Sequence, residues 1–115
     1  MAKDLSDILI EIAKTNEKYF KNYLKYSKII AKVAKKTFKK SCVILFGSIV
    51  KGINPQDIDI LIVSDDVLKK ELRDKFFIEF HKKIEFINPF EIHFATHDQF
   101  ENFYKYFLDK FILIE

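Results

Sequence analysis

Two aspartates separated by one isoleucine, Asp57 and Asp59, stand at the start of an apolar run over residues 60–63. Side chains alternate across a strand, so both carboxylates would lie on one face, roughly 7 Å apart. At an effective dielectric constant near 20, two unit charges at that distance repel by about 2 kcal/mol, and burial would add a desolvation cost. A divalent cation removes this conflict, and magnesium prefers hard oxygen ligands such as carboxylates and phosphates. The pair therefore predicts a magnesium site, with an exposed acidic strand end as the alternative interpretation.

A glycine-containing turn precedes the two aspartates. Residues 41–46 form a short apolar run that predicts a buried strand, and the only two glycines of the chain, Gly47 and Gly52, follow within six residues. Gly47 would permit a sharp turn and a close approach of the backbone to a ligand. Ser48 would offer a hydroxyl and a backbone N–H at the start of a helical turn, where free amides attract phosphate. The segment predicts a phosphate-binding turn; an ordinary strand-to-helix turn, with Gly52 as a C-capping residue, is the alternative.

A third carboxylate completes the candidate site. Pro89 ends the helical pattern before it, and residues 90–95 alternate as a strand with Glu91 and His93 on the same face. If this strand lies beside the strand of Asp59 with the apolar faces aligned, Glu91 joins the two aspartates. Three carboxylates beside a phosphate-binding turn are suited to binding one or two metal ions and to activating an acceptor hydroxyl.

Together these elements resemble the motifs of the polymerase-beta-type nucleotidyltransferases. The matching pattern is Gly47-Ser48-x-x-x-Gly52, then Asp57-x-Asp59 leading into an apolar strand, then Glu91 on a later strand. The short chain is similar to the minimal nucleotidyltransferases (MNT), and to small archaeal members in particular. The motifs lie within residues 42–95, and the lysine-rich segment before them and the aromatic segment after them match more loosely.

The resemblance implies a role for each matching residue. Gly47 and Ser48 would hold the terminal phosphates of ATP or another nucleoside triphosphate, and the remaining nucleotide-binding positions would be Lys51 and Gly52. The catalytic residues and metal ligands would be Asp57, Asp59 and Glu91. In this set Glu91 would ligate the catalytic metal or help to deprotonate the acceptor. The implied reaction is in-line attack on the α-phosphate, with transfer of the nucleoside monophosphate and release of pyrophosphate.

Two positions depart from the pattern of that family. The loop between the second glycine and the first aspartate is only residues 53–56, shorter than usual, and it ends in Gln56 where a small hydroxyl residue is common. Residues 49–51 replace the frequent small-then-arginine pattern, although Lys51 still supplies a positive charge. The alternative to an enzyme is therefore a degenerate, non-catalytic module that binds a nucleotide or a partner protein.

The resemblance also implies a partner. Many such proteins act with a small helical HEPN protein, as the antitoxin half of a toxin–antitoxin pair, and the implied activity is adenylylation of that partner. The 13 Phe residues either fill an aromatic-rich core or leave an apolar surface for a partner or a second copy of the chain.

Length and composition predict one domain. A chain of 115 residues suffices for a sheet and a few helices but not for a separate acceptor-binding domain. We expect an α+β fold with a small mixed sheet of three or four strands. It would comprise a lysine-rich helical part (1–40), a catalytic core (41–95) and a C-terminal helix (96–115) that a capping box starts at Thr96.

Charge is spread unevenly along the chain. Residues 1–40 hold eleven Lys and four acidic residues, a net charge of +7, so the remainder carries −4 of the total of +3. Five lysines cluster at the end of this part: Lys32, Lys35, Lys36, Lys39 and Lys40. A solvated helical face with lysines near its C-terminus is one interpretation, and attraction of RNA or an acidic partner is the other.

Cysteine use and hydropathy indicate the compartment. The single Cys42 cannot form an intramolecular disulfide, and no apolar run approaches the length of a membrane span. The first residues show no signal-peptide pattern. We therefore expect a cytoplasmic protein that does not act in the membrane.

Overall fold

The computed structural model describes residues 4–53 and 55–114, so Asn54 of the short loop is outside the described residues, as are residues 1–3 and 115. The described residues form both helices and strands. In order they are α1 (Leu5–Lys21), α2 (Tyr23–Thr37), β1 (Cys42–Phe46), α3 (Ser48–Lys51), β2 (Ile58–Val63), the 3₁₀ turn η1 (Asp65–Leu68), α4 (Lys70–Lys83), β3 (Phe90–Ala95), α5 (His97–Gln99), the π-helical turn η2 (Phe100–Tyr104), α6 (Lys105–Phe107) and β4 (Phe111–Leu113).

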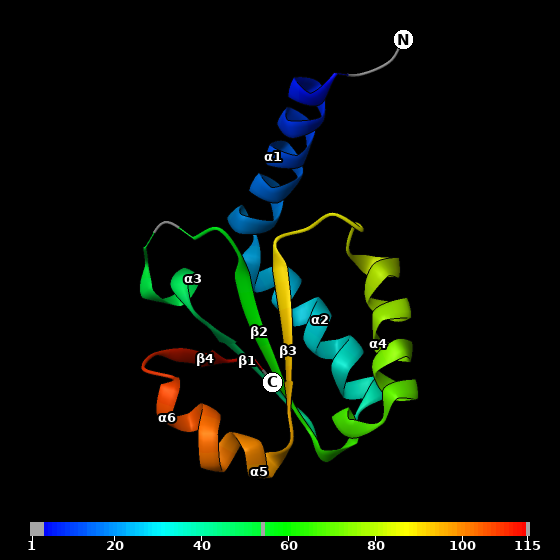
Figure 1. The fold of residues 1–115 in the computed structure, drawn as a ribbon, viewed down its shortest axis with the longest axis vertical. Coiled ribbons are helices and arrows are strands. Elements are labelled where there is room, and N and C mark those ends of the chain that lie inside the picture. Colours follow the sequence, from blue (N-terminus) through cyan, green and yellow to red (C-terminus); the bar gives the residue numbers. More distant parts are fainter. Residues whose placement is uncertain (1–3, 54, 115) are drawn as a thin grey trace.

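The four strands form one mixed sheet in the order β3-β2-β1-β4 (Figure 1). Strands β2 and β3 are parallel, and α4 makes the crossover between them. Strand β1 is antiparallel to both β2 and β4. The prediction of an α+β fold with a small mixed sheet is confirmed.

Helices α2 and α4 pack on one face of the sheet and enclose the main core. This core takes alternate residues of β2, namely Ile58, Ile60 and Ile62, all of which are fully buried. Phe76 of α4 and Ile30 of α2 are equally buried against them. The apolar face that the alternation of β2 predicted is therefore the face that α2 and α4 cover.

The second face of the sheet carries a smaller core. Ile44, Leu61, Val63 and Ala95 are buried there, and the side chains of Phe100, Tyr104 and Leu108 pack against them. These three come from the segment that runs from η2 to the end of α6. Because Val63 and Ala95 end their strands, this segment covers the C-terminal ends of β2 and β3. The N-terminal ends of both strands lie outside this second core.

The helical prediction for the lysine-rich part is confirmed within the described residues, as two helices. Asn22 separates them with non-helical dihedral angles (φ −121°, ψ 35°), and α1 projects away from the sheet (Figure 1). Tyr19 anchors α1, since its ring is buried and its hydroxyl accepts a hydrogen bond of 2.9 Å from the backbone N–H of Glu85. None of the described helices is long and apolar enough to cross a membrane.

The prediction of a helix over the whole of residues 96–115 is wrong at its end. The capping box at Thr96 is present, but the helical segment stops at Phe107 and Phe111–Leu113 forms β4. The backbone of Leu108 is extended (φ −89°, ψ 93°), which ends the helix. A longer helix would leave the outer edge of β1 without hydrogen-bond partners, whereas β4 pairs with it. Phe111 thus belongs to a strand and not to the predicted C-terminal helix.

Candidate active site

The parallel register of β2 and β3 brings the predicted carboxylates together. Asp59 lies directly opposite Glu91, and on its other side it lies opposite Phe46 of β1. Residues that are paired in this way share one face of the sheet. Asp59 and Glu91 therefore stand side by side on the second face, at the N-terminal ends of β2 and β3 that α5, η2 and α6 leave uncovered.

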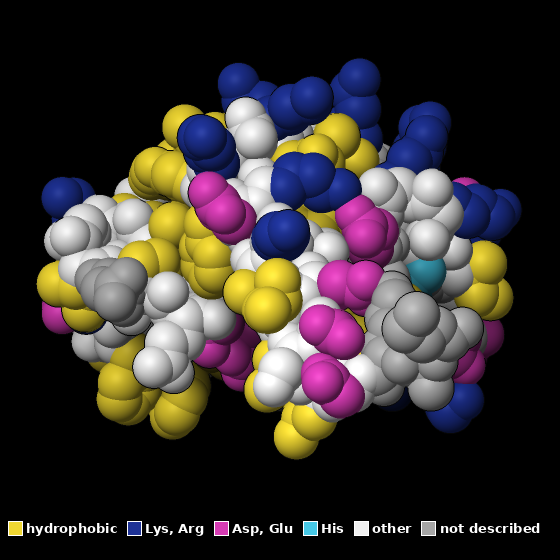
Figure 2. All heavy atoms as spheres, turned by 90° about the horizontal axis from the view of Figure 1, so that it is seen from above, with side chains coloured by type: hydrophobic (Ala, Val, Ile, Leu, Met, Phe, Trp, Pro, Cys, Tyr) yellow, Lys and Arg dark blue, Asp and Glu magenta, His cyan; other side chains and the backbone are white. Residues whose placement is uncertain are grey.

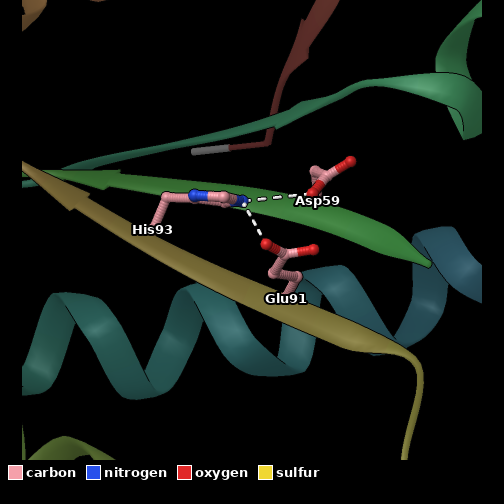
Figure 3. A group of neighbouring side chains, drawn as sticks. All are labelled: Asp59, Glu91 and His93. Carbon is pink, nitrogen blue, oxygen red and sulfur yellow. Dashed lines mark hydrogen bonds and ion pairs between the residues drawn. The ribbon is translucent and has the colours of Figure 1, made fainter.

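His93 lies between these two carboxylates (Figure 3). Its Nε2 atom is 3.1 Å from Oδ1 of Asp59 and 3.7 Å from Oε1 of Glu91. One potential ligand atom from each of the three residues lies within 4.8 Å of the other two. The ring of Phe46 packs against the imidazole, with 5.2 Å between ring centroids. The sequence placed His93 on the face of Glu91 but gave no sign of its contact with Asp59, which depends on the strand order.

Asp57 directly precedes β2 and acts on both of the other carboxylates. The pKa of Glu91 is raised, chiefly through a hydrogen bond shared with Asp57 and then through the charge of Asp59. The pKa of Asp59 is raised chiefly by burial, with the charge of Asp57 adding to the shift and the hydrogen bond to His93 opposing it. The Asp59 side chain is 17% exposed and that of Glu91 is 55% exposed.

These electrostatics fit a divalent cation. Asp57 disfavours the charged forms of Asp59 and Glu91, so a positive ion would stabilise this group, and carboxylate oxygens are the ligands that magnesium prefers. The partly exposed Glu91 leaves the site open to solvent on one side. Asp57, Asp59 and Glu91, which the sequence grouped, are neighbours in the structure.

Gly47 is in direct contact with the carboxylate of Asp59. Its dihedral angles (φ 84°, ψ −157°) lie in a region that essentially only glycine adopts. A Cβ atom at this position would be 2.3 Å from Oδ2 of Asp59. The backbone of Gly47 therefore lies close to Asp59, and the predicted approach of Gly47 to a ligand stays a prediction. Gly52 has the predicted positive φ (74°) as the C-cap of α3, with no other atom within 4 Å of an added Cβ.

The short helix α3 carries the other two residues predicted to bind a nucleotide. Ser48 is its first residue, directly after Gly47, and within the described part of the chain its hydroxyl makes no hydrogen bond. Lys51 is its last residue, and its Nζ atom lies 3.6 Å from Oδ2 of Asp109 in the loop before β4. The hydroxyl is thus available to a ligand, while the ammonium group already has an acidic neighbour.

Two of the clustered lysines, Lys32 and Lys36, lie on the other side of the sheet from the carboxylates. Helix α2 covers the first face, and a cavity of about 560 Å³ between α2 and α4 is lined by Lys32, Lys36, Lys75 and Lys83. Viewed from the α1 end, basic side chains gather along one border and acidic ones nearer the middle (Figure 2). An RNA bound along these lysines would therefore lie on the far side of the sheet from Asp59.

Comparison with known proteins gives the family. A family model described as "Nucleotidyltransferase domain" matches residues 27–114, which leaves α1 outside the match. A solved structure described as "putative nucleotidyltransferase" is 33% identical, with a TM-score of 0.61, and the alignment covers 76% of this chain and 96% of that one.

A second solved structure, a "putative nucleotidyltransferase" from Sulfolobus solfataricus, shares the fold. It is 20% identical, with a TM-score of 0.54, over 86% of this chain and 85% of that one. No match was found among the curated proteins. The residues that the family model matches include all four strands. The match therefore covers every residue of the site described above. The chain belongs to the nucleotidyltransferase domain family of the polymerase-beta superfamily.

Proposed function

We propose that this nucleotidyltransferase binds ATP with Mg²⁺ and transfers AMP to an acceptor hydroxyl, with release of pyrophosphate. The observation that carries the proposal is the pairing of Asp59 with Glu91 across adjacent parallel strands, with Asp57 beside them and Gly47 against Asp59. Family membership supports a nucleoside triphosphate as the substrate.

The proposed reaction assigns separate tasks to the carboxylates. The acceptor oxygen attacks the α-phosphorus, a new P–O bond forms, and the bond to the β-phosphate oxygen breaks so that pyrophosphate leaves. Magnesium, when bound to Asp57 and Asp59, would neutralise the phosphate charges and polarise the α-phosphate. The proton of the acceptor passes to Glu91. The side chain of Glu91 is 55% exposed, so an acceptor hydroxyl can reach its carboxylate from the solvent.

The decisive experiment follows the label from ATP marked at the α-phosphate or at the γ-phosphate. In the presence of magnesium and a cell extract that supplies acceptors, and relative to the same mixture without the protein, additional α-label should become attached to an acceptor and additional γ-label should be released as pyrophosphate. Asp57→Asn/Asp59→Asn should abolish both. Asp74→Asn, a change in an exposed ion pair on α4, serves as the matched control and should leave both unchanged. Release of inorganic phosphate as the first product would contradict the proposal.

The family resemblance extends the proposal to the acceptor and to the MNT branch. The acceptor would be a hydroxyl of a small helical HEPN protein, and its adenylylation would make this chain the antitoxin of a toxin–antitoxin pair. The structure supports a protein partner through apolar side chains that are exposed on α1, namely Leu5, Ile8, Leu9 and Ile10. Attachment of α-label to a purified HEPN partner, with none on unrelated helical proteins, would support this part of the proposal.

A second candidate function is a non-catalytic module that binds nucleotide. Two observations favour it: the loop over residues 53–56 is short, and Lys51 already has Asp109 as an acidic neighbour. Under this function, ATP and magnesium would raise the thermal stability, yet no label would be transferred in the experiment above. Transfer of the label therefore distinguishes the two functions, whereas binding of ATP and magnesium does not.

A further inference from the structure

His93 occupies a position that the proposed reaction does not use. It stands two residues after Glu91 on β3, and its Nε2 atom points into the space between the carboxylates of Asp59 and Glu91 (Figure 3). Phe46 packs against its ring, and its side chain is only 28% exposed. The imidazole nitrogen is therefore held toward the same point as the carboxylate oxygens.

The separations suit ligands of a single cation. With metal–ligand bonds of about 2.1 Å at right angles, two neighbouring ligand atoms are about 3.0 Å apart. The Nε2 atom is 3.1 Å from Asp59 Oδ1 and 3.7 Å from Glu91 Oε1, and all three ligand atoms lie within 4.8 Å of one another. The Nε2 lone pair is free for such a bond when the ring proton is on Nδ1.

We propose that His93 is a metal ligand, and that one cation position of this site therefore prefers a divalent transition metal to magnesium. Imidazole nitrogen suits metals such as cobalt, nickel and zinc, whereas magnesium takes oxygen ligands and gains little from a nitrogen. This inference rests on the proposed function only in assuming that the bound metal takes part in catalysis. The ligands themselves are assigned from the positions of Asp59, Glu91 and His93.

Affinity measurements with two metals test the assignment. Calorimetric titration of the whole protein with cobalt and with magnesium should show tighter binding of cobalt. His93→Gln keeps a side chain that can donate to Asp59 but removes the imidazole. We expect this variant to lose at least about tenfold in cobalt affinity and less than about threefold in magnesium affinity.

The matched control is His97→Gln. His97 also pairs with a carboxylate, since its Nδ1 atom lies 3.3 Å from Oδ1 of Asp65, but it is half exposed and lies beyond the far end of β3. This variant should bind both metals as the wild type does. If it loses cobalt affinity as His93→Gln does, the cobalt is bound nonspecifically to surface histidines and the proposal is overturned.

A spectroscopic readout separates a ligand from a residue that only positions Asp59. Electron spin echo measurements with bound Mn²⁺ should show coupling to a nitrogen nucleus in the wild type and none in His93→Gln. Equal losses of cobalt and magnesium affinity in His93→Gln, or no nitrogen coupling in the wild type, would overturn the proposal. Nitrogen coupling without transfer of α-label would uphold this inference and reject the catalytic function. Transfer of label without the coupling would do the reverse.

Discussion

Gly47, in the turn after β1, lies so close to the carboxylate of Asp59 that there is no space for a side chain at this position. Its backbone lies in a region that costs other residues about 1–3 kcal/mol. An added methyl group would also meet Asp59 Oδ2 at 2.3 Å. Gly47→Ala should therefore lower the free energy of unfolding by about 1–3 kcal/mol and displace Asp59. Urea unfolding and magnesium titration check the two effects.

Gly52 provides the control for that prediction. It also has a positive φ (74°), but an added Cβ would meet no atom within 4 Å. Gly52→Ala should cost about 1–2 kcal/mol through its left-handed backbone alone and should keep the wild-type magnesium affinity. If Gly47→Ala keeps that affinity as well, the contact with Asp59 is not needed for the metal site.

Asp59 should destabilise the metal-free protein at neutral pH. Its pKa is raised chiefly by burial, so its contribution to stability is present below the ordinary pKa of an aspartate and is lost as pH rises through the raised value. Asp59→Asn should leave the free energy of unfolding at neutral pH unchanged or higher, because Asn keeps an acceptor for His93 without the charge. The same variant should lose all stabilisation by magnesium with ATP. A clear loss of stability in the metal-free protein, with the magnesium response intact, would refute the metal site.

At the scale of elements, Asp66 of η1 ties the end of α2 to the segment after β2. Its carboxylate accepts a hydrogen bond of 2.8 Å from the backbone N–H of Lys39 and lies 3.1 Å from Nζ of Lys69. The pKa of Asp66 is lowered, first by the bond from Lys39 and then by Lys69. Its contribution to stability is therefore present above the ordinary aspartate pKa and is lost as pH falls through the lowered value.

Asp66→Asn should accordingly be less stable than the wild type at neutral pH, and the difference should shrink below about pH 3.9, the ordinary pKa of aspartate. Urea unfolding across this range measures the effect. Asp74→Asn, on the exposed face of α4, should change the stability by no more than about 0.5 kcal/mol at any pH. A constant difference between wild type and Asp66→Asn down to acidic pH would show that the charge is not responsible.

The C-terminal segment shows where a local pattern stops being informative. The helix that the capping box at Thr96 predicted extends as far as Phe107, but beyond Leu108 the chain can form either a further helical turn or a strand. The free edge of β1 decides it, because pairing with β4 satisfies backbone groups that would otherwise have no partner in the sheet. The sequence of residues 108–114 does not by itself indicate that β1 has a free edge to pair with.

At the scale of the whole molecule, ligand binding should raise the stability of the fold. ATP with magnesium at 100 times the dissociation constant should add about 2.7 kcal/mol, which corresponds to roughly 10 °C in the unfolding midpoint for a domain of this size. Thermal unfolding of the wild type and of Asp57→Asn/Asp59→Asn, with and without both ligands, tests this. The rise should vanish in the double variant, and a rise that persists there would place the nucleotide elsewhere.

Lysines of α2 and the carboxylates lie on opposite faces of the sheet, an arrangement that the sequence did not predict. The first face carries the main core under α2 and α4, with lysines outside it, and the second face carries the carboxylates beyond the smaller core. A nucleotide at Asp59 and a polyanion at the lysines could therefore be bound at once without contact. The lysine cluster and the carboxylates are both evident in the sequence, but their separation depends on which helices cover which face of the sheet.

The sequence by itself determined the chemistry of the site and the strands that carry it. Glycine at position 47, the alternation through Asp57 and Asp59, and Glu91 on a later strand are local patterns, and local patterns follow from backbone geometry. The tertiary structure alone decided what depends on residues far apart in the chain. The parallel pairing of β2 with β3 sets Asp59 opposite Glu91 and brings His93 between them, and the open edge of β1 makes a strand of Phe111–Leu113. These outcomes rest on packing and hydrogen bonding between distant segments, which no local pattern encodes.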